Sequence, residues 1–341
     1  MKKILLIAVM AVSLTSCEKW FGNGPTDPTS ENIVVSGMLT EDTHWFSDST
    51  YEMAGKVVVD SGVTLTIDAG TTILAREGQG SLSSALIVAR GGMIMAEGTA
   101  EHPIVFTSVL SEEVDLDVSD AGLWGGVVIL GNAPISADAE EANIEGVPVN
   151  DEFGLYGGED QMDNSGVFTY VSIRHAGTLL GDGNELNGLT LGGGRRGNTI
   201  DNIEVVANLD DGIELFGGCV NASNLLVWAQ GDDAFDVDQG WFGVITNYVN
   251  VEGADSDHGM ELDGGEGTTN PFFTFKQGTF LSTDGVEFHF RDGAMGSVQY
   301  DYTMGTANIE ADSATSVMIN TEMGADLSVF EWTMTHAAGK L

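Results

Sequence analysis

Cysteine, proline and basic residues are all scarce in this chain of 341 residues, which contains two cysteines, six prolines and 12 lysines and arginines. Two cysteines exclude a framework of several disulfides, so burial and hydrogen bonds must hold the fold together. The 52 acidic residues give a formal net charge of −40, and such a chain repels nucleic acid and anionic lipid surfaces and attracts cations. We therefore expect no nucleic-acid partner. A solvated acidic surface suited to a salty habitat would have the same composition.

Long apolar segments are also missing, since the apolar run at 4–12 is about half of the ~20 residues that a membrane-spanning helix needs. This run follows Lys2 and Lys3 and precedes a small-residue cleavage site, which is the order of a secretory signal. The residues Leu-Thr-Ser-Cys at 14–17 resemble the lipobox of bacterial lipoproteins, in which the cysteine is lipidated and becomes the first residue of the mature chain. We predict a lipoprotein signal peptide at 1–16 and a lipid anchor at Cys17 that holds the protein at the cell envelope, on the outer membrane or cell surface. An ordinary cleaved signal with a coincidental cysteine is the alternative.

The remaining residues form two regions of different composition. Residues 17–30 are rich in glycine, proline and serine without an apolar period, which predicts a flexible tether. Residues 31–341 lack the three-and-four spacing of apolar residues that a long helix needs, and the chain has 46 glycines. This region is long for one compact core but ordinary for a repeat solenoid, which grows in one direction.

An internal repeat supports the solenoid. Four segments align, at 210–215, 232–237, 257–262 and 283–288, and each has a carboxylate between two apolar residues. These carboxylates are Glu214, Asp236, Glu261 and Glu287, at intervals of 22, 25 and 26 residues, which is the length of one solenoid turn. Alternation directs the apolar pairs inward and the carboxylates outward. A second strand per turn is indicated at 203–205, 225–227 and 248–251.

The pattern predicts an all-β, single-domain, right-handed parallel β-helix over residues 31–341. An acidic insertion around 136–166 interrupts the strand rhythm. The N-terminal half contains GVTLTIDAGT at 62–71, GGMIMAEGT at 91–99, HPIVFTS at 102–108 and WGG at 124–126. These runs resemble a widespread family of bacterial surface β-helix proteins, many of them lipoproteins of Bacteroidetes and marine bacteria, over roughly residues 50–335. The resemblance implies fold and export, and the family has no agreed biochemical function.

Stacked coils bring the repeated carboxylates together. Consecutive coils lie about 4.8 Å apart, and two ionised carboxylates at that spacing repel by roughly 3–4 kcal/mol at an effective dielectric constant of about 20. The next outward position holds Phe216, Asp238, Asp263 and His289. Calcium is the natural counter-ion because it accepts six to eight oxygen ligands in loose geometry. We predict calcium ligands at Asp232, Asp233, Asp236, Asp238, Glu261 and Asp263, with raised pKa values or solvated side chains as the alternative.

Two groups of β-helix enzymes are also similar to this sequence. The segments 209–212, 231–233 and 257–259 fall at spacings like those of the Asn-Thr-Asp, Gly-Asp-Asp and Gly-His-Gly elements of polygalacturonases. That resemblance implies an inverting acid and base among Asp211, Asp232, Asp233 and His258. The match is incomplete because the first element lacks Asn-Thr and the Arg-Ile-Lys element is replaced by His-Phe-Arg at 289–291. Asp-Gly corners on every coil would produce the same pattern.

Calcium-dependent pectate lyases give the second comparison, since they combine an aspartate cluster with a lysine or arginine base. Lys276 and Arg291 are the candidate bases, and only Arg291 lies on the carboxylate face by parity. Pairing of Arg291 with Asp292 or Glu287 would give it a purely structural role.

The sequence thus favours a lipid-anchored envelope β-helix that binds divalent cations and a glycan, in a binding or structural role. The alternative is a polysaccharide-degrading enzyme, either a glycosidase or a calcium-dependent lyase. An enzyme should have a groove where carboxylates converge with a cationic residue. A binding scaffold should present carboxylates alone on a flat face.

Overall fold

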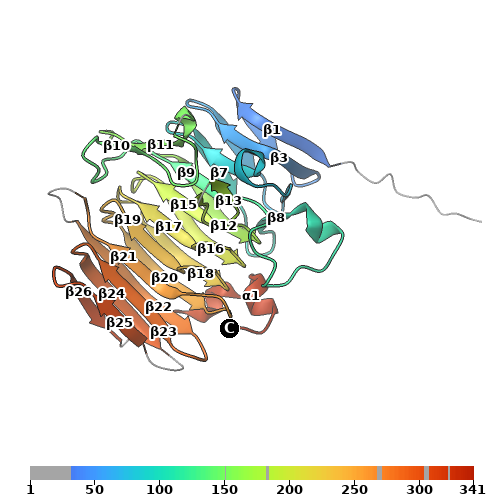
Figure 1. The fold of residues 1–341 in the computed structure, drawn as a ribbon. Coiled ribbons are helices and arrows are strands. Elements are labelled where there is room, and N and C mark those ends of the chain that lie inside the picture. Colours follow the sequence, from blue (N-terminus) through green and yellow to red (C-terminus); the bar gives the residue numbers. More distant parts are fainter. Residues whose placement is uncertain (1–31, 150, 182–183, 267–270, 303–306, 322) are drawn as a thin grey trace, which may run out of the picture. The chain divides into compact units, whose positions relative to one another are not determined.

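The computed structural model describes residues 32–149, 151–181, 184–266, 271–302, 307–321 and 323–341. The predicted signal peptide, Cys17 and the predicted tether lie outside these residues. Within them, parallel strands stack into three ladders, and the chain visits the ladders in turn as it advances from coil to coil (Figure 1). This arrangement is a parallel β-helix, so the fold class predicted from the repeat is confirmed.

The strands divide among the ladders as follows. The first ladder contains β2 (Thr43–Trp45), β4 (Thr64–Ile67), β7 (Met93–Glu97), the first halves of β12 (Gly166–Arg174), β16 (Thr199–Val206), β18 (Ala222–Trp228), β20 (Val244–Val251), β22 (Phe272–Leu281) and β24 (Met295–Tyr302), and β26 (Ser316–Asn320). The second ladder contains the first parts of β1 (Ile33–Leu39) and β3 (Thr50–Val59), then β5 (Thr72–Ala75), β8 (Ile104–Ser108) and the second halves of β12, β16, β18, β20, β22 and β24. The third ladder contains the ends of β1 and β3, then β6 (Ala85–Val88), β9 (Val127–Leu130), β15 (Leu189–Gly192), β17 (Ile213–Phe216), β19 (Phe235–Asp238), β21 (His258–Asp263), β23 (Val286–Arg291) and β25 (Ala307–Ala311).

Shorter elements lie outside the ladders. Two antiparallel hairpins pair β10 (Glu141–Asn143) with β11 (Leu155–Gly157) and β13 (Leu179–Gly181) with β14 (Asn184–Glu185). The helices are the single turns Gly80–Leu82, Val109–Glu112, Glu152–Gly154 and Leu327–Phe330, and α1 (Met334–Ala337). Within the described residues, no helix has both the length and the apolar character required to cross a membrane.

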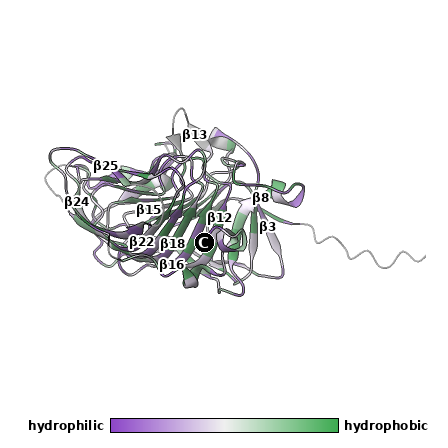
Figure 2. Cartoon of the chain, turned by 90° about the horizontal axis from the view of Figure 1, so that it is seen from below, coloured by the Kyte–Doolittle hydropathy of each residue, from purple (hydrophilic) through white to green (hydrophobic). Residues whose placement is uncertain are grey.

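The core follows from the alternation of apolar and polar residues along each strand. Inward side chains of all three ladders form one apolar cluster, and hydrophobic and hydrophilic residues are interleaved along the stacked strands (Figure 2). Ile213 and Leu215 of β17 and Phe235 and Val237 of β19 are fully buried in this cluster, as the repeat predicts. The intervening residues, such as Glu214 and Asp236, point to the outer face of the β-helix.

A bend between the first and second ladders recurs at equivalent positions in consecutive coils. The backbone φ is positive at Tyr170, Asn202, Asn224, Asn247 and Gln277, a conformation that asparagine tolerates better than most residues. The Asn247 Nδ2 donates a hydrogen bond to the Asn224 Oδ1 at 2.7 Å, so the side chains also link neighbouring coils. The bend therefore recurs at the same place in these coils, next to the junction of the first and second ladders.

The C-terminal segment folds back over the outer face of the second ladder. Phe330 packs in an apolar cluster with Leu226 and Val249. The amide nitrogen and the Oγ1 of Thr335 both donate to the buried Glu204 Oε1 at 2.8 Å. These contacts cover the apolar part of that face, so the second ladder has no exposed apolar stripe there.

The segment between β9 and β12 contains the residues predicted as an acidic insertion. It carries the β10–β11 hairpin, and its apolar residues Ile144, Val147 and Tyr156 are buried against the outer face of the third ladder. We call residues 135–149 and 151–156 the covering segment. Its acidic residues face outward, so its composition alone did not reveal the apolar side that docks on the helix.

Candidate metal centre

The candidate site lies on the outer face of the third ladder, where equivalent residues of successive coils form one line. We call this line the outer row, and its members in chain order are Met38, Val58, Ile87, Val128, Thr190, Glu214, Asp236, Glu261, His289 and Glu310. The row is apolar in its first four coils, and from Glu214 onward it is acidic except at His289. The covering segment lies on the apolar part and leaves the acidic part open.

The prediction that Glu287 follows Glu261 in this row is wrong. Glu261 pairs with His289, and Glu287 pairs with His258. The β21–β23 register also shifts between His258 and Met260. Gly259 lies inside β21, whereas the equivalent corner glycine, Gly285, precedes β23. A Cβ at position 259 would approach the side chains of Val286 and Phe280 to 2.6 and 2.8 Å, so only glycine fits there. The observed partner of Glu261, His289, lies two residues beyond the predicted partner Glu287, and a difference of two residues preserves which side chains face outward.

The second outward position was predicted correctly for one pair and wrongly for the next. Phe216 pairs with Asp238 as expected. Asp263 pairs with Arg291 instead of lying beside His289, for the same reason of register. The basic residue Arg291 consequently enters the acidic part of the face.

The open part of the face is a hollow of about 340 Å³, which we call the acidic hollow. It is lined by Glu145, Asp210, Asp211, Glu214, Asp232, Asp233, Asp236, Asp238, Glu261, Asp263 and Arg291. All six predicted calcium ligands are among these residues. Glu145 was missed because it comes from the covering segment, and no spacing in the sequence connects that segment to the repeat.

Carboxylates in the hollow gather into groups that could hold a cation. Three groups contain carboxylates only: Asp210, Asp211 and Asp232; Asp211, Glu214 and Asp236; and Asp233, Asp236 and Glu261. The candidate ligand atoms of each group lie within 4.8 Å of one another, about twice the length of a calcium–oxygen bond. Three oxygens at such distances can contact one ion, with carbonyl or water oxygens completing its shell.

The electrostatics of the hollow also favour a bound cation. Burial raises the pKa of the Asp211, Glu214 and Asp236 carboxyls well above their usual range, and repulsion between neighbouring carboxylates raises it further. Holding these groups ionised therefore costs free energy in the folded state. A cation at their centre would remove that cost, because it offsets both the desolvation and the repulsion.

A buried amide adds a neutral ligand next to one carboxylate. Asn187 is 2% exposed, and its Nδ2 donates to the Glu214 Oε2. The Asn187 Oδ1 has no hydrogen-bond partner among the described residues. An unsatisfied buried acceptor costs about 1–3 kcal/mol, and a cation beside Glu214 would satisfy it. Asn187 precedes β15 and lies outside the repeat, so no sequence pattern pointed to it.

The residues predicted as an acid–base set also meet at the hollow. The Asp233 Oδ1 lies 2.7 Å from the His258 Nδ1 and accepts the His258 backbone N–H at 3.1 Å. The Asp211 Oδ1 in turn accepts the Asp233 backbone N–H at 2.9 Å. The hydrogen bond that the Asp233 carboxylate accepts from the His258 ring raises the pKa of His258. Asp211, Asp233 and His258 thus form a chain across three coils, with Asp232 on its exposed side.

The two candidate lyase bases are separated by the fold. Lys276 is exposed on β22 in the first ladder, whereas Arg291 lines the acidic hollow. Arg291 forms ion pairs with Glu261 and with Asp263, where Nε lies 3.1 Å from Oδ1. The expected structural partners of Arg291, Asp292 and Glu287, do not hold it within the described residues. A cationic residue therefore converges with the carboxylates.

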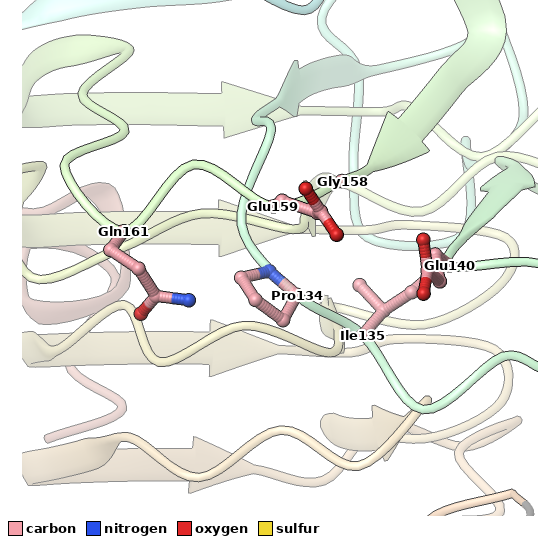
Figure 3. A pocket seen from close by; sticks show the side chains of 6 residues that line it. All are labelled: Pro134, Ile135, Glu140, Gly158, Glu159 and Gln161. Atoms are coloured by element: carbon pink, nitrogen blue, oxygen red, sulfur yellow. The ribbon is translucent and has the colours of Figure 1, made fainter.

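A larger cavity of about 490 Å³ lies beside the covering segment. Figure 3 shows its lining residues, where the carboxylates of Glu140 and Glu159 lie near Pro134 and Ile135. The described residues bring no third metal-ligating side chain to those two carboxylates. This cavity lacks the convergence of charged groups that distinguishes the acidic hollow.

Comparison with known proteins assigns a family. Residues 37–282 match the family model of the pectate-lyase-like β-helix domain. The match spans most of the chain, so the chain belongs to this family. Searches of curated proteins and of solved structures found no match.

Proposed function

We propose that this member of the pectate-lyase-like β-helix family is a lipid-anchored envelope protein that binds calcium in the acidic hollow and, through calcium, a polysaccharide bearing carboxylate groups. One observation carries the proposal: buried carboxylates of adjacent coils come within bonding reach of a common ion. A family of this kind is compatible with a polysaccharide-related role.

Calcium suits the hollow better than magnesium. The hollow supplies many carboxylate oxygens on side chains of different length, and calcium accepts such irregular sets. Magnesium requires near-ideal octahedral geometry and gives up its water reluctantly. The unsatisfied Asn187 Oδ1 beside Glu214 provides an oxygen of the kind that calcium accepts.

Calcium also explains how an acidic protein would hold an acidic polymer. Arg291 is the one basic residue that lines the hollow, and Glu261 and Asp263 already pair with it. A polymer carboxylate would therefore meet net repulsion in the absence of metal. A calcium ion with open coordination positions can bridge protein and polymer carboxylates, which makes glycan binding depend on the metal.

The metal is tested by calorimetric titration and by thermal unfolding with calcium, magnesium or chelator. We expect calcium to stabilise the protein, by about 2.7 kcal/mol at a hundred times its Kd. Glu214→Gln with Asp236→Asn should lose most of this gain. The matched control Glu97→Gln with Glu101→Gln removes two exposed carboxylates elsewhere and should retain it. Equal melting temperatures of the unchanged protein in chelator and in millimolar calcium would refute the calcium function.

Glycan binding is tested separately, with polygalacturonate and a neutral polymer of similar length. We expect polygalacturonate to bind in calcium and to dissociate on chelation. Binding of both polymers regardless of calcium would contradict the bridging role while leaving the metal site intact.

Cleavage of the polysaccharide is a second candidate function, favoured by the convergence of Arg291 and the Asp233–His258 pair with the carboxylates. Such convergence is the feature that distinguishes a catalytic groove from a flat binding face. The assay measures new reducing ends and unsaturated products from polygalacturonate. Activity that His258→Gln and Arg291→Gln abolish would establish an enzyme, and bound but intact polymer would leave binding as the function.

The anchor is tested by fractionation. Cys17→Ser should release the protein from membranes into the soluble fraction, because lipid on Cys17 is the proposed attachment. Membrane association that persists in Cys17→Ser would remove the anchor from the proposal.

A further inference from the structure

We propose that a second and chemically different metal position, formed by Asp232, Asp233 and His258, lies at the edge of the acidic hollow and takes a transition-metal ion of the zinc class. The inference rests on the proposed cation-binding function, which it extends from one kind of ion to two. The inference arises from the His258 imidazole, which brings a nitrogen ligand next to two aspartates that line the hollow.

The three side chains come from adjacent coils. Asp232 and Asp233 form the corner before β19, and His258 is the first residue of β21. Their candidate ligand atoms lie within 4.8 Å of one another. The β-bulge at Gly259 shifts His258 out of the regular register, and the bulge depends on a residue without a Cβ. This local irregularity, rather than the repeat, places the imidazole beside the aspartates.

The imidazole is also held in place. The Asp233 Oδ1 contacts both the ring Nδ1 and the backbone N–H of His258. The Asp233 backbone is fixed in turn by its hydrogen bond to Asp211. Histidines that bind metals characteristically contact a carboxylate that sets the ring orientation. The ring is therefore preorganised before any metal binds.

Ligand chemistry separates the two positions. Imidazole nitrogen suits zinc, copper, iron and nickel, whereas calcium takes oxygen ligands. The position at His258 shares no residue with the oxygen-only group of Asp211, Glu214 and Asp236, which is therefore the calcium position that can be filled at the same time. The other two oxygen-only groups include Asp232 or Asp233 and would compete with it. Asp232 is exposed and His258 is partly exposed, so solvent can supply the remaining ligands. A three-residue set with open coordination is also the arrangement that catalytic metal sites use.

A second histidine lies close to this end of the hollow. The rings of His258 and His289 are 5.3 Å apart between centroids, and the His289 Nδ1 lies 3.1 Å from the Glu261 Oε2. His289 therefore provides a control for whether zinc binding requires the His258 ring specifically or any nearby imidazole. His289→Ala should affect binding less than His258→Ala, because only His258 belongs to the group.

The experiment titrates zinc and cobalt into the protein, purified without a polyhistidine tag, in saturating calcium. We expect one zinc equivalent to bind and cobalt to give visible absorption bands that zinc abolishes. His258→Ala should weaken zinc binding about tenfold or more. Asp232→Asn, which changes an exposed side chain and leaves the core untouched, should weaken it in the same direction. His102→Ala, at an exposed histidine remote from the hollow, is the matched control and should bind zinc normally.

The outcomes separate this inference from the calcium function. Zinc binding that is unchanged in both His258→Ala and Asp232→Asn overturns the second position, whatever calcium does. Zinc displaced stoichiometrically by calcium also overturns it, because the two ions would then share one site. Zinc binding that needs His258 in a protein without any calcium response supports the second position and refutes the calcium function.

Discussion

The two halves of the outer row have the same strand geometry. They differ in the chemistry of their outward side chains and in whether the covering segment lies over them. Val58, Ile87 and Val128 are buried beneath the covering segment. Glu214, Asp236 and Glu261 occupy the same positions of later coils and line an open hollow. The inward side chains are apolar in both halves. The comparison teaches that the inward apolar residues maintain the β-helix. The outward residue of each coil is apolar where the covering segment packs on it and acidic where the face is open to solvent.

The boundary between the halves is built by close packing. The ring of Tyr156 from the covering segment lies over Gly192, where a Cβ would approach the Tyr156 side chain to 3.0 Å. The same ring packs against Phe216, with centroids 5.7 Å apart. Beyond Phe216 the second outward position becomes Asp238, and there the covering segment contributes the acidic Glu145 instead of apolar residues. The covering segment thus buries the apolar half of the outer row and contributes a carboxylate to the acidic half.

The largest expected effect comes from placing a carboxylate, the side chain typical of the acidic half, at a buried position of the apolar half. Val128→Asp introduces at a fully buried position the residue type found at Asp236, and an unpaired buried charge should lower the free energy of unfolding by about 4 kcal/mol or more. Urea unfolding measures the change. Met38→Asp is the control, since Met38 belongs to the same row but is 48% exposed, and it should cost little. Similar losses for both variants would show that the covering segment does not define the difference.

The next effect tests the cover itself. Tyr156→Ala should lower the free energy of unfolding by about 3 kcal/mol, because it removes a buried ring and leaves a cavity above Gly192 and Phe216. Tyr156→Phe retains the ring and should stay close to the unchanged protein. Urea unfolding of the two variants compares them. If Tyr156→Ala were as stable as Tyr156→Phe, the packing of the Tyr156 ring against the β-helix would contribute little to the free energy of unfolding.

A smaller effect of opposite sign is expected in the acidic half. In chelator, Glu214→Gln with Asp236→Asn should raise the free energy of unfolding by about 1–2 kcal/mol, because it removes two charges that burial and repulsion disfavour. Thermal and urea unfolding without metal give the measurement. A lower free energy of unfolding in the double variant would indicate that the two carboxylates stabilise the folded state even without metal.

The smallest effect is the pH dependence of stability that Glu214 and Asp236 contribute. The folded pKa values of Glu214 and Asp236 lie above their unfolded values, so above pH ~4 the folded protein binds more protons than the unfolded chain. In chelator, the free energy of unfolding should therefore fall as the pH rises through this range, by about 1 kcal/mol per pH unit. Glu214→Gln should flatten the slope and Val128→Ala should not. A stability that rises with pH over the same range would reverse the assigned direction of the shifts.

Sequence reasoning reached the repeat, the direction of the side chains and most of the hollow. Alternation around Glu214 and Asp236 was enough to place both outward, and counting residues was enough to stack them. Counting failed at Glu287, because the residue that pairs with Glu261 is His289, and the alignment of the repeated motifs does not report how long each coil is. The apolar side of the covering segment was likewise missed, because Ile144 and Tyr156 are isolated among acidic residues.

The sequence by itself determined the β-helix, since a period-two pattern repeated at coil length has one way to bury its apolar residues. It also determined that a column of carboxylates would meet on one face. Only the tertiary structure decided that the column opens into a hollow, that Arg291 and Glu145 line it, and that His258 contacts Asp233 at its edge. The physical reason is that local alternation sets which way a side chain points, whereas its neighbours depend on register shifts and on distant segments that dock by shape.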